Sequence, residues 1–367
     1  MSVERSFTRI VESLPPTIPF VAPEALERQR GRALQLRIGA NESNFGLSPM
    51  ARAAMVQAVD KIHWYNDPEG FELRQALAAE LDVDMSAVAL GAGIDEFLGL
   101  MVRLFVEPGE TVVTSLGAYP TFNYHVEGYG GVLHKAPYRE DREDLDALLA
   151  LAQKVQPKLV YVANPDNPMG TWQNADALQN FIEALPSASI LLLDEAYVDF
   201  APEEALLPLA PDGARVVRLR TFSKAHGMAG ARIGYAVADK EIIAALDKIR
   251  NHFGVNRVAQ AGALASLADR AFVLSVVKQV EEGKKAYAAL ARELGIEMIP
   301  SATNFVALDI GSGERARALL QALLARDVFV RMPGVAPLDR CIRLTVGPAA
   351  ERKVFAEILR EVLPQVG

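Results

Sequence analysis

Cysteine is nearly absent from this sequence, since Cys341 is the single cysteine in 367 residues. One cysteine cannot form a disulfide within the chain, so stability has to come from burial of apolar side chains, which a chain of this length can supply. The thiol lies in the apolar run Cys-Ile-Arg-Leu-Thr-Val. This context predicts a packed side chain in a reducing compartment.

Long runs of like charge and long apolar runs are also missing. The net charge is −8 and is spread along the chain, which argues against nucleic acid or an anionic membrane as partner. No apolar run is long enough to span a bilayer, and residues 1–10 lack the apolar stretch of a signal peptide. We therefore expect a cytoplasmic protein. The five histidines are not paired at ligand spacing, so we expect no metal site.

What is present is an alternation of short β-branched runs with amphipathic stretches, which is typical of βαβ units. Half of the residues are apolar and 23% are charged, as in a globular protein. Several runs have almost no polar face, which indicates a sheet covered by helices on both sides. The predicted strands are 88–90, 111–114, 132–136, 159–163, 190–194, 216–220 and 233–237.

The pattern changes near residue 256. Two long helical patterns at 257–267 and 272–294 are followed by shorter strands and a closing helix at 349–362. The strands of this part are predicted at 305–308, 328–331 and 342–346. We therefore expect a large α/β domain over 44–255 and a smaller α+β domain over 256–367, with 1–43 forming an N-terminal arm and part of the small domain.

Polar residues follow four of the predicted strands, at the edge where ligands bind in open α/β sheets. They lie in the segments Asn164-Pro-Asp-Asn-Pro-Met-Gly170, Asp194-Glu-Ala-Tyr197, Thr221-Phe-Ser-Lys224 and Gly91-Ala-Gly93. Each has an ordinary structural alternative: a helix N-cap for Asp194, a surface lysine for Lys224, and a plain turn for the Asn/Pro loop. Together they supply an amine, a carboxylate and an amide, which a pyridoxal phosphate site requires.

The order of these motifs carries a resemblance. NP-x-NP-x-G, then DEAY, then SK-A-x-G-M-A-G-x-R-x-GY, then R-L-T-V-G resembles the fold-type I aminotransferases of class I/II, and within them the histidinol-phosphate aminotransferases. The similarity runs from about residue 38 to 347. It implies a pyridoxal-phosphate enzyme with a mixed, mostly parallel sheet flanked by helices and a smaller α+β domain.

The resemblance assigns residues to the cofactor ring. Lys224 matches the lysine that binds the cofactor covalently and later shuttles a proton, and Asp194 matches the carboxylate that pairs with the pyridine nitrogen. Asn167 and Tyr197 match the donors to the ring hydroxyl oxygen. Tyr119 matches the aromatic side chain that stacks on the ring, although a packing role is its structural alternative.

The phosphate of the cofactor needs a local cradle in an acidic protein. Gly93, Ile94 and Asp95 open a predicted helix and offer free backbone N–H groups. By resemblance, Ser223 and Arg232 complete the cradle, and Tyr65 reaches the phosphate from the neighbouring subunit of a homodimer. A dinucleotide-binding turn fits poorly here, because Glu96 occupies the place of the third glycine.

By resemblance, two arginines bind the anionic end of a small-molecule amino donor or oxo-acid acceptor. Arg343 matches the main contact and Arg331 a second basic group, since arginine in an apolar strand is costly unless it meets an anion. Asn41 and the position of Phe20 match further substrate contacts. Arg340, in a Pro/Asp-rich loop, is predicted to be a surface charge.

Two positions depart from the family pattern. Phe20 and Phe253 stand where tyrosines usually contact histidinol phosphate, and loss of both hydroxyl groups weakens the case for that substrate. The loop 250–257 is rich in basic and amide groups. It faces another substrate or forms a turn between domains, and the sequence does not decide between these.

The leading hypothesis is a pyridoxal-phosphate aminotransferase that moves an amino group from an amino acid or amino-alcohol phosphate to a 2-oxo acid. A decarboxylase resembling threonine-phosphate decarboxylase shares the cofactor motifs. A non-catalytic pyridoxal-phosphate-binding module is the alternative from another class, although the chain offers no helix-turn-helix extension or basic arm. A nicotinamide oxidoreductase would leave Lys224 without a role.

Overall fold

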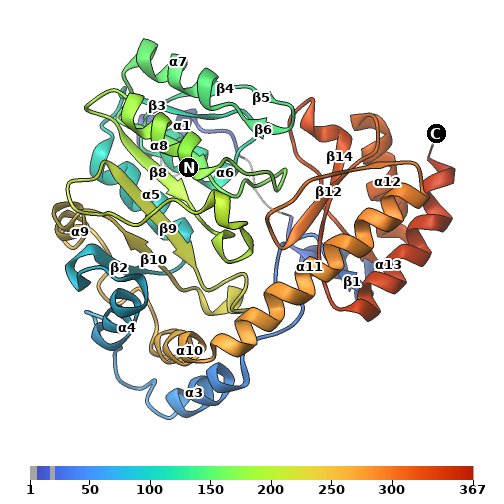
Figure 1. The fold of residues 1–367 in the computed structure, drawn as a ribbon, viewed down its shortest axis with the longest axis horizontal. Helices are drawn as coiled ribbons and strands as arrows, with labels where there is room; N and C mark the ends of the chain where they lie inside the picture. Colours follow the sequence, from blue (N-terminus) through green and yellow to red (C-terminus); the bar gives the residue numbers. More distant parts are fainter. Residues whose placement is uncertain (1–5, 17–20, 367) are drawn as a thin grey trace, which may run out of the picture.

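The computed structural model describes residues 6–16 and 21–366. It shows a large part built on a sheet covered by helices and a smaller C-terminal part, with a long helix running between them (Figure 1). The strands are β1 (Leu36–Arg37), β2 (Val88–Gly91), β3 (Thr111–Ser115), β4 (Val132–Ala136), β5 (Tyr138–Arg139), β6 (Arg142–Glu143), β7 (Leu159–Ala163), β8 (Ile190–Asp194), β9 (Val216–Thr221), β10 (Gly234–Val237), β11 (Glu297–Ile299), β12 (Phe305–Asp309), β13 (Val328–Phe329) and β14 (Cys341–Thr345).

The helices follow the amphipathic stretches. They are α1 (Arg9–Ser13), α2 (Pro23–Arg30), α3 (Pro49–Val59), α4 (Phe71–Leu81), α5 (Ile94–Phe105), α6 (Pro120–Gly128), α7 (Leu145–Val155), α8 (Ala175–Ala184), α9 (Lys240–Leu246), α10 (Arg257–Ala268), α11 (Arg270–Glu293), α12 (Gly313–Ala325) and α13 (Ala349–Val362). Short 3₁₀ turns connect several of these elements.

The central sheet has seven strands in the order β2-β10-β9-β8-β7-β3-β4. β10 is antiparallel to both of its neighbours and the other pairs are parallel, which gives the mixed, mostly parallel sheet that the sequence predicts. Side chains of β7 alternate between the two faces: Tyr161 packs with the α5 and α6 side, while Val160 and Val162 pack with α7 and α8. Both faces are therefore covered, which explains the apolar strands.

The C-terminal part has its own core around Phe305, Leu319 and Phe355. Its antiparallel sheet has the order β11-β12-β14, and β1 pairs with β13 in parallel, so the segment before the large domain belongs to this core. The predicted strand 328–331 is shorter than expected: its ladder ends at Phe329, and an isolated bridge joins Arg331 to Arg343.

α10 packs against α3 and α4, and its Ala259 and Ala263 share a buried cluster with Leu73 of the large domain. α11 instead joins the C-terminal core and begins after Asp269, whose side chain caps it. The domain division at residue 255 stays a prediction, and this packing favours a boundary at the break between α10 and α11.

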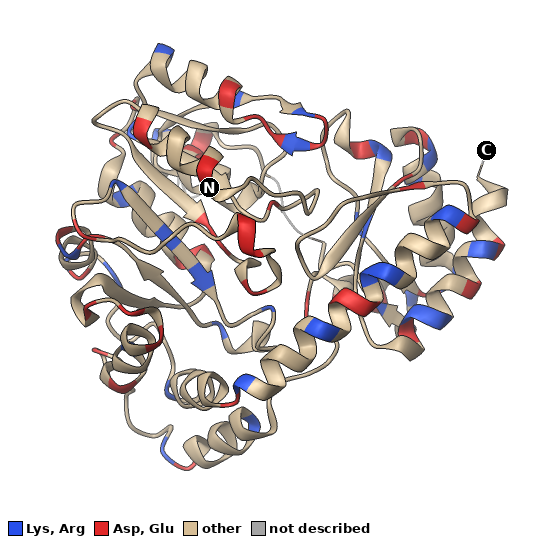
Figure 2. Cartoon of the chain, viewed as in Figure 1, with Lys and Arg blue, Asp and Glu red and all other residues tan. Residues whose placement is uncertain are grey.

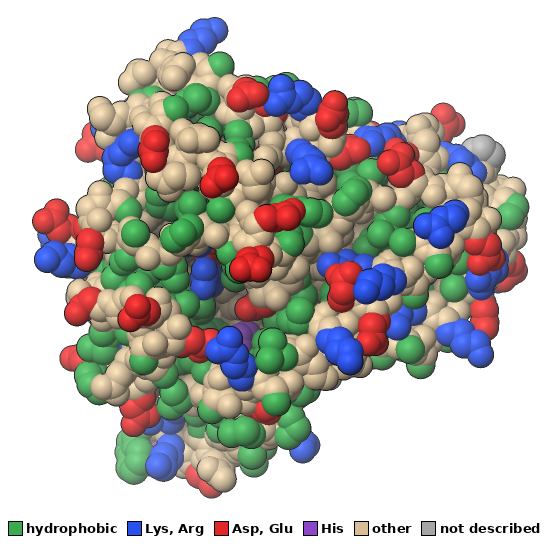
Figure 3. Space-filling view, in the orientation of Figure 1, with side chains coloured by type: hydrophobic (Ala, Val, Ile, Leu, Met, Phe, Trp, Pro, Cys, Tyr) green, Lys and Arg blue, Asp and Glu red, His purple; other side chains and the backbone are tan. Residues whose placement is uncertain are grey.

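Charged side chains of both signs are interspersed over the cartoon, including along α11 and α13 (Figure 2), and the face drawn in Figure 3 is similarly mixed. Within the described part of the chain, no single helix is long and apolar enough to cross a membrane. α10 and α11 reach that length and composition only as a pair bent by 79°.

Candidate active site

A cavity of about 920 Å³ lies where the carboxyl ends of the central strands face the C-terminal core. The parallel strands β7, β8 and β9 all end at this edge, so segments far apart in the sequence meet there. The cavity collects most of the residues that the sequence singles out: Asn41, Ile94, Asp95, Tyr119, Asn167, Asp194, Tyr197, Ser223, Lys224, Arg232, Arg331 and Arg343. Convergence of these polar groups in one large cavity is typical of a binding site.

Lys224 follows β9 and places its amine inside the cavity. Its Nζ donates to the backbone carbonyl oxygen of Asn41 at 3.1 Å and lies 5.4 Å from the centre of the Tyr197 ring. Asn41 has a left-handed backbone with φ of 55°, and its side-chain Nδ2 donates to the Tyr197 hydroxyl at 2.9 Å. Asn41 therefore positions both the lysine and the tyrosine.

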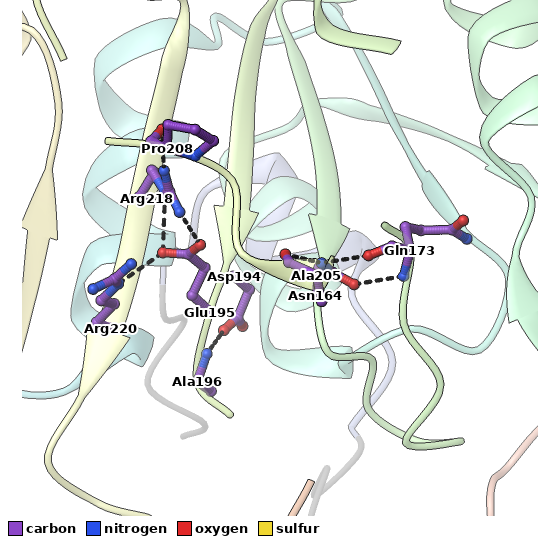
Figure 4. A network of polar contacts seen from close by, with 9 residues as sticks. All are labelled: Asn164, Gln173, Asp194, Glu195, Ala196, Ala205, Pro208, Arg218 and Arg220. Atoms are coloured by element: carbon purple, nitrogen blue, oxygen red, sulfur yellow. Dashed lines mark hydrogen bonds and ion pairs between the residues drawn. The ribbon is translucent and has the colours of Figure 1, made fainter. Parts of the chain in front are cut away.

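Asp194 ends β8 and is only 5% exposed. Its Oδ2 accepts from the Tyr161 hydroxyl at 2.7 Å. Its Oδ1 accepts from the backbone N–H of Ala196 at 2.9 Å, a contact drawn in Figure 4. Burial raises the pKa of Asp194 to about 6, although these two hydrogen bonds and the charge of Lys224 oppose the shift. A buried carboxylate of this kind is well suited to pair with a cation.

Asn167 and Arg343 contact one another across the cavity. The Asn167 Oδ1 accepts from Nη1 of Arg343, which leaves the Nδ2 donor of the amide directed away from the arginine. Burial is the main cause that lowers the pKa of Arg343 below its ordinary value. Its guanidinium also lies 5.2 Å from the centre of the Phe305 ring, so a partly apolar wall holds it.

Arg331 is the second arginine at this end of the cavity. It is bridged to Arg343 by backbone hydrogen bonds, and its Nη2 donates to the carbonyl oxygen of Val21 at 3.1 Å. Two guanidinium groups on neighbouring backbone segments make this end of the cavity strongly cationic. Such an end suits an anionic group with several oxygen atoms.

Another part of the cavity wall is built by the start of α5, which contributes Ile94 and Asp95. Gly93 is the N-cap, with φ of 86° and no side chain, and a Cβ there would lie 2.5 Å from Nη2 of Arg232. Asp95 accepts from the Tyr119 hydroxyl at 2.9 Å and pairs with Arg232 at 3.4 Å. Free backbone N–H groups at a helix start, with an arginine beside them, fit a phosphate dianion.

Ser223 also lines the cavity, and its hydrogen-bond partner, Thr221, was not predicted as a site residue. The Thr221 Oγ1 donates to the Ser223 Oγ at 2.9 Å and accepts from its backbone N–H at 3.0 Å. Both residues are buried and line the cavity. Thr221 therefore fixes the position of the Ser223 hydroxyl.

Three further residues that support the site were missed in the sequence. Tyr161 is the one residue with a polar side-chain atom in the run Leu-Val-Tyr-Val-Ala, which was the available signal. Asn304 donates to the carbonyl oxygen of Asn41 at 3.1 Å. Glu143 is buried close to Asp166 and Asp194, and burial followed by the Asp166 charge raises its pKa well above the ordinary value. The positions of Asn304 and Glu143 in the sequence carry no comparable signal.

The prediction for Arg340 was wrong. Its side chain is 23% exposed and forms two ion pairs, with Asp309 at 2.6 Å and with Asp141 at 2.7 Å. Asp141 belongs to the β5–β6 turn of the large domain and Asp309 ends β12 of the C-terminal core. Arg340 thus joins the two domains, because carboxylates distant in sequence surround it.

Gly93, Tyr65 and Phe253 are not among the residues that line the cavity. Tyr65 is 78% exposed, and its ring packs against Phe253 with 4.8 Å between ring centres. Phe253 is itself exposed, in the loop 250–257. Phe20 lies outside the described residues.

The profile of the aminotransferase class I and II family matches residues 34–359. The chain belongs to the class I and II aminotransferases. Histidinol-phosphate aminotransferase 2 of Carboxydothermus hydrogenoformans is 35% identical to this aminotransferase. The match covers 97% of the present chain and 98% of the Carboxydothermus protein. The histidinol-phosphate aminotransferase of Sinorhizobium meliloti, solved in complex with pyridoxal-5'-phosphate, is 48% identical with a TM-score of 0.96 over 100% of both chains.

An aspartate aminotransferase from Thermus thermophilus, solved with maleate, shares the fold at 22% identity, with a TM-score of 0.80 over 99% of both chains. The predicted fold-type I architecture is therefore confirmed, and so is the prediction of an aminotransferase enzyme. The family depends on pyridoxal phosphate, so this aminotransferase belongs to that cofactor class.

Proposed function

We propose that the cavity holds pyridoxal phosphate with Lys224 as its covalent attachment, and that the enzyme moves an amino group from a histidinol-phosphate-like amine to a 2-oxo acid such as 2-oxoglutarate. The observation that carries the proposal is that Lys224 and Asp194 line the same cavity as the arginines Arg331 and Arg343. An amine, a buried carboxylate and an anion site then lie within reach of one small molecule.

The residues present fit the cofactor. The N-terminus of α5, with Gly93 as its N-cap, would receive the phosphate together with Ser223 and Arg232. Asp194 would keep the pyridine nitrogen protonated, and Asn167 and Tyr197 would donate to the ring hydroxyl oxygen. When bound, pyridoxal phosphate supplies an electron sink next to the substrate Cα.

The chain's own groups then divide the remaining work. Lys224 Nζ would take the proton from the substrate Cα when it is not attached to the cofactor. Tyr119 would pack on the ring face and hold it in position. Arg343 and Arg331 would bind the phosphate of the donor and, in the second half-reaction, a carboxylate of the acceptor. Asn41 and Phe20 remain proposed substrate contacts.

The names of the relatives support histidinol phosphate as the donor to test first. Phe20 and Phe253 oppose it, because both lack the hydroxyl group that family members usually present. A cationic pocket without these hydroxyl groups would still accept the phosphate of histidinol phosphate. The two phenylalanines would therefore alter the recognition of its imidazole end.

We also propose a homodimer in which Tyr65 reaches the phosphate of the neighbouring active site. Its support is an exposed apolar surface around α3 and the segment after it, together with the exposure of Tyr65 itself. The large apolar side chains of this surface are Met50, Val56, Val59, Ile62, Trp64, Tyr65, Phe71 and Phe253. An apolar surface of this kind typically marks an interaction site. The cytoplasm remains our proposed location.

The test is a donor panel that includes histidinol phosphate, glutamate and aromatic amino acids, read by the absorbance of the bound cofactor. A donor that changes the spectrum and is released as its oxo product supports the proposal. Carbon dioxide release without an oxo acid from any donor would select the decarboxylase. A protein that binds the cofactor but leaves every donor intact would be a binding module.

A further inference from the structure

Glu195, the residue after Asp194, is enclosed by two arginines of β9. Its Oε2 accepts from Nε of Arg218 at 3.0 Å and from Nε of Arg220 at 2.8 Å, and its Oε1 accepts from Nη2 of Arg218. Figure 4 shows the Glu195 carboxylate directed toward these arginines, while Asp194 is directed toward the amide of Ala196. The side chains of Glu195 and Arg218 are only 4% and 5% exposed.

The three side chains form a charged cluster inside the protein. Burial on its own would raise the pKa of Glu195, but Arg220 and Arg218 outweigh it, so the pKa lies below its ordinary value and the carboxylate stays ionised. Arg218 also donates from Nη1 to the carbonyl oxygen of Pro208 at 2.8 Å. A buried ion pair contributes little net stability after desolvation. Here the three hydrogen bonds from Arg218 and Arg220 define where the Glu195 carboxylate lies.

The cluster lies where the two strands that carry the reactive groups leave the sheet. β8 ends at Asp194 and β9 leads through Thr221 to Lys224. Beyond the end of β8, the backbone N–H of Glu195 donates to the carbonyl oxygen of Leu219 at 2.8 Å, which extends the pairing of the strands by one step. The next N–H, of Ala196, is a donor to the Asp194 carboxylate.

We propose that Glu195 is a positioning residue: through Arg218 and Arg220 it fixes the end of β8 against β9, and so sets the Asp194 carboxylate in the place where it meets the cofactor. This rests on the proposed role of Asp194. Glu195 itself does not line the cavity, so it acts through Asp194 and the Ala196 amide.

The experiment compares Glu195→Gln with a control variant, Asp309→Asn. This control removes one of the two ion-pair partners of Arg340 and changes no residue that lines the cavity. Apoenzymes are titrated with pyridoxal phosphate, and the pH midpoint of the absorbance change of the bound cofactor is measured together with Tm. Both variants are expected to lower Tm. Glu195→Gln is expected to raise the Kd for pyridoxal phosphate at least about tenfold and to shift the pH midpoint, whereas Asp309→Asn leaves both near wild type.

Arg220→Lys is the second variant, because it keeps the charge of the cluster and changes its geometry. A smaller change in Kd in the same direction is expected, and it keeps the test open if Glu195→Gln does not fold. A Kd within twofold of wild type in whichever of these variants folds overturns the positioning role. Binding of pyridoxal phosphate by the wild-type protein tests the proposed function. The ratio of the Kd of each variant to the wild-type Kd tests the role of Glu195 separately.

Discussion

The amine of Lys224 donates a 3.1 Å hydrogen bond to the backbone carbonyl oxygen of Asn41, a residue 183 positions earlier in the chain. That carbonyl oxygen also accepts from Asn304, while the Asn41 N–H donates to the Thr345 hydroxyl and its side chain donates to Tyr197. Asn41 thus ties the lysine of the large domain to β14 and to the residue that precedes β12 in the C-terminal core. The position of the reactive amine depends on both domains.

Replacing Lys224 should abolish both attachment and turnover. In Lys224→Ala, pyridoxal phosphate has no amine to bind covalently, and no base remains at the substrate Cα, so the rate should fall at least about 10³-fold. Borohydride reduction followed by peptide mass analysis should place the cofactor on Lys224 in wild type. Modification of a different lysine in wild type would contradict the assignment.

The raised pKa of Asp194 predicts a pH-dependent stability of the cofactor-free enzyme. Its folded-state pKa is about 6 against an ordinary 3.8, so the folded protein binds this proton more tightly than the unfolded chain does. Ionisation of Asp194 should therefore lower the free energy of unfolding of the protein by up to about 3 kcal/mol as the pH rises from about 4 through about 6.

Asp194→Asn cannot titrate, so urea unfolding of the apoenzyme should show a smaller loss across this pH window than wild type shows. Asp176→Asn is the matched control, because Asp176 is an exposed residue of α8. Identical pH profiles for wild type and Asp194→Asn would contradict the raised pKa.

The sequence predicted that the segments carrying Asp194 and Lys224 would meet, because parallel strands place their carboxyl ends at one edge of a sheet. The family resemblance then assigned a role to each residue. Arg340 was assigned wrongly because its partners, Asp141 and Asp309, come from two other segments. Tyr161 and Asn304 were missed for the same reason: each acts on a residue distant in sequence. Local pattern specifies strand ends, whereas the packing of the two domains decides which side chains meet.

Arg343 should matter more for substrate affinity than for the chemical step. Arg343→Lys keeps a positive charge but loses the planar fork that binds two oxygen atoms, so KM for an acidic acceptor should rise about 10- to 100-fold with a smaller change in kcat. Steady-state kinetics with 2-oxoglutarate measures both. Arg331→Lys should give a smaller rise, and equal effects of the two substitutions would show that the arginines share the anion.

Arg340→Ala should destabilise the protein, because it leaves the carboxylates of Asp141 and Asp309 unpaired while partly buried. The expected loss is about 1 to 3 kcal/mol, measured by urea unfolding. Arg317→Ala, which removes a more exposed arginine paired with Asp339 at 3.2 Å, is the control and should cost less than about 1 kcal/mol. A loss no larger than that of the control would restore the interpretation of Arg340 as a surface charge.

Hybrid dimers provide the sharpest test of the proposed role of Tyr65. If each active site uses its own Lys224 and the partner subunit's Tyr65, then Tyr65→Ala and Lys224→Ala homodimers are both impaired in both sites. A mixed dimer has one site with both defects and one site with neither, so mixing the two variants after dissociation should restore activity above the sum of the separate preparations. Lys224→Ala mixed with a Tyr65→Ala, Lys224→Ala double variant gives no intact site and is the matched control. Absence of restored activity in mixed dimers, with exchange verified by mass, would place the Tyr65 contribution within its own subunit.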